Sequence, residues 1–385
     1  MNELLIGLLG AVLATNQPQA VSNLIQQNAG LSVAIPNPND PVGKELEQLM
    51  AGDDAAMAEV DKWIRDNNAF AAQGAGESKA ELNQRILARL NLVRKSYEDF
   101  LRRHPDSARG HLAYASFLDN LGDEEAAMLQ SKKALELDPK NPAAWNNLAN
   151  YYGENGGLTN AFAYYAKAIE LNPAEPVYYQ NLGIIVYLYR KDAMAFYQLN
   201  EQQVFDKSLA LYRKAMQLSP DNFPLATDYA ESYYGIRPLR TNDALVAWTN
   251  ALQIARDDDE REGVYVHLAR IKMLAGRYAE ARAQLDAVTN ATYSGLKHTL
   301  EHAIAQRESE ATNTAAAGLS TNTPVFPANH FNAPTNALTV ISNVKITPSN
   351  SVPALTNSPA FSPKIVSALT NVPPDPPKAS GLSRP

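Results

Sequence analysis

The most enzyme-like string in the sequence is His298-Thr-Leu-Glu301-His302. On a helix, residues four apart lie on one face, so the two histidines could ligate one metal ion beside a glutamate base. A catalytic zinc site also needs a third protein ligand, and the only carboxylates downstream are Glu308, Glu310 and Asp375. We therefore expect a solvated helix with no metal ligand, no catalytic residue and no cofactor. A metal-dependent enzyme using His298 and His302 is kept as an alternative.

The acidic run Asp257-Asp258-Asp259-Glu260 is a second place where cation chemistry has to be considered. It lacks the glycine and the spaced oxygen ligands of a calcium loop. Acidic side chains are stabilised at the start of a helix, where the helix dipole favours negative charge. The run is therefore expected to be a solvated loop with its acidic residues at the start of the next helix.

Composition removes further classes of function. The 385 residues carry a formal net charge of −7, whereas a nucleic-acid-binding protein needs a basic face to neutralise phosphates. The absence of cysteine excludes disulfides, thiolate zinc sites and a cysteine nucleophile. No phosphate-binding glycine loop is present. We expect a non-enzymatic protein that does not bind nucleic acid.

The first 40 residues are predicted to be an apolar segment followed by a loose linker. The apolar run Leu4–Ala14 is shorter than the roughly 20 residues of a transmembrane helix, so no membrane span is expected. The residues before the run include Glu3 and no lysine or arginine, which disfavours a secretory signal. The expected location is cytoplasmic; the alternative is an exported or periplasmic protein, if residues 1–14 act as a signal peptide.

Residues 41–107 are predicted to form N-terminal helices that act as a helical cap. Apolar residues recur every three or four positions from Val42 to Trp63, and Gly52-Asp53-Asp54 predicts a break between two short helices. A longer helix is expected over residues 78–103, ending at His104-Pro105. This helix is interpreted as the second half of an imperfect leading repeat.

Three segments of the chain end alike: ALELDP at 134–139, AIELNP at 168–173 and AMQLSP at 215–220. The first two are spaced by 34 residues. Residues 142–175 place Trp145, Leu148, Ala149, Tyr152, Ala161, Tyr165, Ala168 and Pro173 at positions 4, 7, 8, 11, 20, 24, 27 and 32 of such a unit. In period and pattern the sequence resembles the tetratricopeptide repeat family, whose units are helix-turn-helix pairs of 34 residues.

The resemblance implies an all-α, tetratricopeptide-like solenoid, because small residues at positions 8, 20 and 27 let paired helices approach closely. About five units are expected over 108–290, namely 108–141, 142–175, 176–222 with an insertion near 191–203, a degenerate 223–261, and 262–290. A C-terminal capping helix at 291–308 and a disordered tail at 309–385, rich in Pro, Asn and Thr, are expected to follow.

The resemblance also implies a function. In this family the first helix of each unit faces a concave groove, and the corresponding side chains here are Asn146, Asn150, Gln180, Ile184, Tyr187, Thr227, Glu231, Tyr234, Val266 and Arg270. Asn and Gln amides can pair with a peptide backbone, and Tyr gives contact area. We expect an interaction scaffold or adaptor that binds a protein or peptide partner in this groove. The alternative is a structural subunit of a larger assembly, and the oligomeric state stays open.

Overall fold

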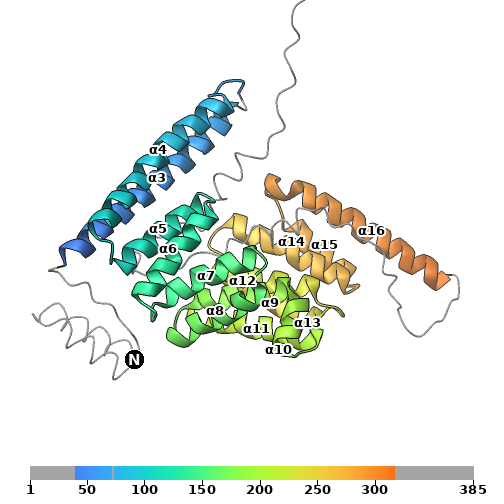
Figure 1. The fold of residues 1–385 in the computed structure, drawn as a ribbon. Coiled ribbons are helices and arrows are strands. Elements are labelled where there is room, and N and C mark those ends of the chain that lie inside the picture. The colour runs from blue at the N-terminus through green and yellow to red at the C-terminus, as the bar shows by residue number, and fades with distance from the viewer. Residues whose placement is uncertain (1–39, 72, 317–385) are drawn as a thin grey trace, which may run out of the picture. The chain divides into compact units, whose positions relative to one another are not determined.

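The computed structural model describes residues 40–71 and 73–316. This part of the chain contains fourteen α-helices, two short 3₁₀ helices and no strand, which confirms the all-α helix-turn-helix fold class (Figure 1). The predicted apolar run Leu4–Ala14 and most of the predicted tail lie outside the described residues. Across the described ranges, no helix is both long enough and apolar enough to cross a membrane.

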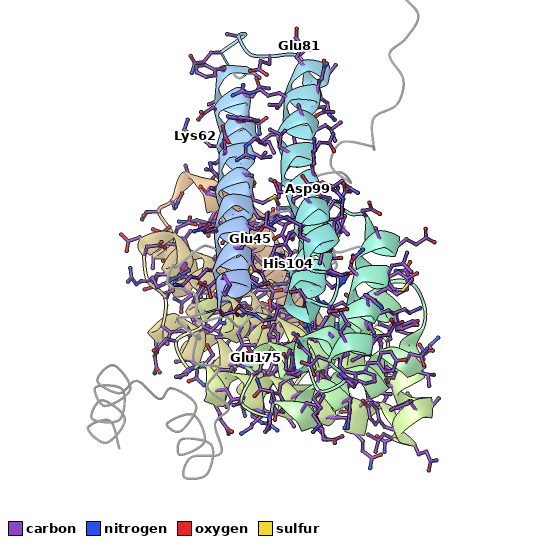
Figure 2. The ribbon with its side chains drawn as sticks, turned by 60° about the vertical axis from the view of Figure 1, so that its left-hand side comes forward. Glu45, Lys62, Glu81, Asp99, His104 and Glu175 are labelled. Atoms are coloured by element: carbon purple, nitrogen blue, oxygen red, sulfur yellow. The ribbon has the colours of Figure 1, made fainter. Side chains whose placement is uncertain are left out.

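The described chain divides between Tyr151 and Tyr152 into two compact units, here named unit 1 and unit 2. Unit 1 begins with an antiparallel pair, α3 (Pro41–Ala71) and α4 (Lys79–Arg103). Helix α4 starts in a capping box, because the Ser78 hydroxyl accepts from the Glu81 N–H while the Glu81 carboxylate accepts from the Ser78 N–H. The labelled Glu45 and His104 lie close together on the two helices (Figure 2).

The predicted break at Gly52-Asp53-Asp54 is wrong, because α3 continues through it without interruption. The buried side chains of α3, among them Leu46, Ala56 and Val60, share a core with α4 on both sides of the glycine. Packing against a long partner helix therefore outweighs the cost of about 1 kcal/mol that glycine imposes on a helix interior.

The rest of unit 1 comprises α5 (Ala108–Asn120), α6 (Glu124–Leu137) and the first part of α7 (Pro142–Glu154). Gly122 makes the turn between α5 and α6 with a φ of 79°, a left-handed conformation that glycine adopts without strain. The small residues Ala127 and Ala134 of α6 are buried, as the repeat pattern predicts. Helices α5 and α6 lie within the predicted first repeat, residues 108–141.

Unit 2 continues with α8 (Leu158–Leu171), α9 (Pro176–Leu188), α10 (Arg190–Tyr197) and α11 (Glu201–Leu218). The predicted insertion supplies α10 and the first turn of α11. Phe196 and Tyr197 of α10 pack on Phe162 of α8, with ring centroids 5.2 and 5.5 Å apart. The insertion is therefore an additional short helix that packs on the neighbouring repeat helices.

The fourth and fifth predicted repeats also form helix pairs. They are α12 (Phe223–Glu231), the 3₁₀ turn η1 (Ser232–Gly235) and α13 (Thr241–Gln253), followed by α14 (Asp258–Leu274) and α15 (Tyr278–Asp286). After a 3₁₀ turn, η2 (Ala291–Tyr293), the closing helix α16 runs from Ser294 to Ala316. The predicted end at 308 is therefore too early, and residues 309–316 belong to this helix rather than to the tail.

Candidate functional site

The predicted groove residues fall in both units. Asn146 and Asn150 lie on the part of α7 that belongs to unit 1. The others lie in unit 2, on α9 (Gln180, Ile184, Tyr187), α12 (Thr227, Glu231), η1 (Tyr234) and α14 (Val266, Arg270). The first helices of three successive repeats in unit 2 thus carry candidate residues.

Several of the predicted residues are buried. Asn146, Asn150, Ile184, Tyr187 and Val266 are each less than a tenth exposed. The Asn146 and Asn150 side chains are engaged by neighbours within the fold. These side chains pack within the fold and leave little of their surface for a ligand.

Thr227 and Tyr187 are also engaged within the protein. The Thr227 hydroxyl donates to the carbonyl oxygen of Pro224 at 2.8 Å, within its own helix. The Tyr187 ring packs on Phe205, with centroids 5.9 Å apart, and its hydroxyl lies against Gly235 of η1. Tyr187 therefore links the third repeat to the irregular turn η1 of the fourth repeat.

The remaining predicted residues come together in one polar group with two neighbours. We name it the unit-2 cluster; its members are Gln180, Asp228, Glu231, Tyr234, His267 and Arg270. All six residues are partly buried, with some of each residue left at the protein surface. The cluster joins α9 to α12 through a hydrogen bond of 2.9 Å from Gln180 Nε2 to Asp228 Oδ2.

The other half of the cluster is organised around Tyr234. The Tyr234 hydroxyl lies 3.1 Å from His267 Nδ1, and the Arg270 guanidinium lies over the Tyr234 ring with Cζ 4.6 Å from its centroid. The His267 ring stacks on Trp248, with centroids 4.1 Å apart and planes at 10°. Stacking on a buried tryptophan fixes the imidazole, and the cation–π contact holds the guanidinium beside it.

The electrostatics of the cluster are set by desolvation. Burial raises the pKa of Asp228 to about 7, and the nearby Glu231 charge raises it further, against the Gln180 hydrogen bond. Burial also raises the pKa of Glu231 to about 7, against the attraction of Arg270. The pKa of His267 is lowered to about 3 by burial and by the Arg270 charge, so this imidazole is neutral.

Glu231 has no strong counter-ion among the described residues. The ion-pair contact it makes is to His267, whose Nε2 lies 4.0 Å from Glu231 Oε1 and whose imidazole is neutral near pH 7. Arg270 acts on Glu231 only through the attraction of its charge. The cluster therefore presents two carboxyl groups, an amide, a phenol and a guanidinium from three successive repeats. Such a set can donate to and accept from the backbone and polar side chains of a bound chain.

Asp228 and His267 were not among the predicted groove residues. Each occupies the position next to a groove position, directly after Thr227 and Val266, and each lies one helical turn before a predicted residue, Glu231 and Arg270. Helical spacing of three residues places such pairs on one face. This spacing is the signal that could have identified both.

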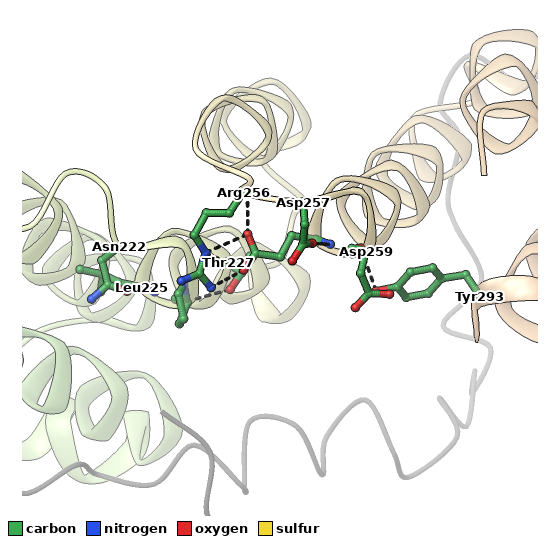
Figure 3. Close-up of polar contacts among 9 residues, drawn as sticks. Asn222, Leu225, Thr227, Arg256, Asp257, Asp259 and Tyr293 are labelled. Atoms are coloured by element: carbon green, nitrogen blue, oxygen red, sulfur yellow. Dashed lines mark hydrogen bonds and ion pairs between the residues drawn. The ribbon is translucent and has the colours of Figure 1, made fainter. Parts of the chain in front are cut away.

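Neither of the two motifs with potential metal chemistry forms a metal site in the described part of the chain. His298 and His302 of α16 are exposed, and within residues 40–71 and 73–316 no three histidine or carboxylate side chains gather as a metal site requires. The acidic run starts α14, as predicted. Asp257 caps the helix by accepting from the Glu260 N–H at 2.8 Å, and Glu260 pairs with Arg256 (Figure 3).

Comparison with known proteins gives matches to a repeat family and to solved structures. No curated protein matches. Among solved structures, MamA is 20% identical over 45% of this chain and 92% of its own, with a TM-score of 0.36. YrrB, described as a tetratricopeptide protein with an unusual peptide-binding site, is 14% identical over 54% and 97%, with a TM-score of 0.41. PilF of Pseudomonas aeruginosa is 16% identical over 67% and 99%, with a TM-score of 0.42. At these values the likenesses support no statement about partners.

Two family models, both described as tetratricopeptide repeat, match residues 108–141 and 131–163. The matched residues cover α5, α6, α7 and the start of α8, which are the helix pairs that the 34-residue period predicts. Repeats of this kind serve generally as scaffolds for protein interaction, since stacked units create extended binding surfaces. Residues 108–163 therefore belong to the tetratricopeptide repeat family.

Proposed function

We propose that this protein is a non-enzymatic interaction scaffold that binds a peptide or protein partner at the unit-2 cluster. The observation that carries the proposal is that Gln180, Glu231 and Arg270 come from three successive repeats and meet in one partly exposed polar group with Asp228, Tyr234 and His267. A chain lying across three repeats would meet amide, carboxyl and guanidinium groups in turn. The repeat family of residues 108–163 supports this general role.

The groups of the cluster suit recognition of a partner rather than covalent chemistry. His267 is held neutral, stacked on Trp248, and hydrogen bonded to Tyr234, so it is fixed in place. Arg270 is held over the Tyr234 ring. Fixed side chains lose little conformational entropy on binding, which favours affinity.

Affinity capture from the native host's lysate tests the proposal. The bait would be the full chain, compared with a double variant, Glu231→Gln and Arg270→Ala, that removes both charges. The matched control is Glu280→Gln with Arg277→Ala, an exposed ion pair at the start of α15 outside the cluster. We expect a specific protein that is captured by the wild type and by the control and lost with the cluster variant. Equal capture by all three baits would contradict the proposal.

A second candidate function, a structural subunit of a larger assembly, is favoured by the exposed apolar residues beside the inserted helix. Leu188, Tyr189 and Phe196 are each between 37% and 39% exposed, although large apolar side chains are usually buried. Light scattering after size exclusion would test this candidate. A stable oligomer that Phe196→Ser converts to a monomer would support it, and a monomer for the wild type would contradict self-assembly.

A further inference from the structure

The α3–α4 pair is held by a series of cross-helix contacts along its length. Near the open end, Glu45 pairs with Arg103 and His104. Further along, Glu59 pairs with Arg89 at 2.9 Å, and the Arg85 guanidinium lies 3.9 Å from the centroid of the Trp63 ring. Each of these contacts pairs a side chain of α3 with a basic side chain of α4 or of its C-cap residue His104.

Between these two positions, Asp53 of α3 makes the cross-helix contact. It differs from the other contacts because its partner, Tyr97, is not a basic residue. Its Oδ2 accepts from the Tyr97 hydroxyl at 2.9 Å, while its Oδ1 is removed from solvent and has no hydrogen-bond partner. No lysine, arginine or histidine among the described residues forms an ion pair with it. A desolvated carboxylate without a cation is unfavourable, so this position favours the neutral acid.

Asp53 lies between a tightly packed part of α4 and a part of α3 whose helical structure is weakened by glycine. On α4, Tyr97 is 1% exposed, and its ring stacks on Tyr114 of α5 with centroids 5.3 Å apart. On α3, the adjacent residue is Gly52, where a Cβ would meet no atom within 4 Å. Glycine at this position therefore has no packing role, and it weakens the helix interior.

The ionisable groups that act on Asp53 come from both helices. Tyr97 of α4 donates to it and favours the charged form, and Asp54 of α3 repels that form. Tyr114 of α5 stands behind Tyr97, and its own hydroxyl donates to Glu98 at 3.2 Å. Burial dominates, and the pKa of Asp53 is raised to about 7, within the range of ordinary cellular conditions.

We propose that Asp53 is a proton-dependent latch of the α3–α4 pair: with its proton the middle of α3 packs on α4, and without it α3 loosens around Gly52. The inference concerns unit 1 and does not depend on the function proposed for the unit-2 cluster. The direction of the pH effect follows from the linkage between proton binding by Asp53 and packing of the two helices. The packed state holds a proton over the interval between the ordinary Asp pKa and the raised one, so raising the pH through this interval favours opening.

Hydrogen exchange of the full chain, read by mass spectrometry, tests the latch. After correction for the intrinsic rate, opening of the segment around Gly52 is expected to rise about tenfold from pH 6 to pH 8 in the wild type. In Asp53→Asn the rise should disappear. The control is Glu47→Gln, which removes the same charge from an exposed position of α3 and should behave as the wild type.

A second variant keeps the test decisive if Asp53→Asn folds poorly. Tyr97→Phe removes the donor that favours the charged carboxylate, so the rise in exchange should move to higher pH. An exchange rate in the wild type that is independent of pH would overturn the proposal. So would the same rise in Asp53→Asn as in the wild type, because the rise would then come from another group.

Discussion

The hydroxyl of Tyr187 occupies the space that a Cβ on Gly235 would need, since that Cβ would lie 1.8 Å from the Tyr187 oxygen. Tyr187 belongs to α9 and Gly235 ends η1, so the contact joins the third repeat to the fourth. It explains why a side chain at a position expected to face the groove is instead almost fully buried. The tyrosine fills a space that the irregular turn of the fourth repeat leaves beside its glycine.

Gly235→Ala is therefore expected to destabilise the protein by about 1–3 kcal/mol, the usual cost of overpacking. Chemical denaturation measures the loss. Tyr187→Phe removes the contacting oxygen, so the same alanine should cost less in that background. A double-mutant cycle with no coupling between the two positions would show that the contact does not exist in solution.

Ala149 tests the repeat alignment. Its side chain is fully buried at a position where the family pattern requires a small residue. Ala149→Trp should overpack the buried surroundings of this residue and lower the free energy of unfolding by about 1–3 kcal/mol or more. Thermal unfolding checks this expectation, with Ala58→Trp on an exposed part of α3 as the control. An unchanged melting temperature for the Ala149 variant would contradict the alignment.

Glu262 connects the start of α14 to the segment before η2. Its carboxylate accepts from the N–H groups of Thr289 and Asn290 at 2.7 and 2.6 Å and from the Thr289 hydroxyl at 2.8 Å. These hydrogen bonds, that of the Asn290 N–H first, lower its pKa, so they contribute stability above the ordinary Glu pKa that is lost as the pH falls.

Glu262→Ala should consequently lower the melting temperature at pH 7 and leave a smaller difference from the wild type at pH 3. Glu280→Gln, on the exposed face of α15, serves as the comparison. A constant difference across this pH range would mean that the charge of Glu262 is not what the N–H groups recognise.

The unit-2 cluster predicts a pH dependence of opposite sign. The folded-state pKa values of Asp228 and Glu231, about 7, lie above their ordinary values, so the folded protein binds more protons than the unfolded chain between roughly pH 4 and 7. These two groups therefore reduce stability as the pH rises through that window. Asp228→Asn should raise the melting temperature at pH 8 by roughly 2–4 °C and leave it nearly unchanged at pH 4. A lower melting temperature at pH 8 would contradict the assigned charge states.

Much of the fold was predictable from the sequence because its periodicity is strong. The 34-residue spacing of ALELDP and AIELNP fixed the helix pairs, and the small residues Ala161 and Ala168 are buried where the pattern requires. The predicted helix break at Gly52-Asp53-Asp54 was wrong because these residues indicate only the local helix propensity. They carry no information about packing against the long partner helix α4, which keeps α3 continuous. The prediction ended α16 too early because the change in composition near residue 309 does not coincide with the end of the helix.

The candidate site was predictable in part. Spacing selected Gln180, Glu231, Tyr234 and Arg270, which the structure places on α9, α12, η1 and α14, and these residues do gather. It could not show that Tyr187 turns into the junction with Gly235, because that depends on the irregular η1 turn. It also omitted Asp228 and His267, since their roles come from contacts with Gln180 of α9 and Trp248 of α13.

The central claim, that a partner binds at the unit-2 cluster, is tested most directly by site-specific photo-crosslinking. A benzoylphenylalanine would replace Thr227, which is partly exposed beside Asp228, or Leu296, which is 52% exposed on α16, a helix that carries no member of the cluster. Irradiation in the native host's lysate is predicted to yield one defined adduct from position 227, lost in the Glu231→Gln and Arg270→Ala background, and none from position 296. An adduct that forms only from position 296, or one that persists without the two charges, would contradict the account.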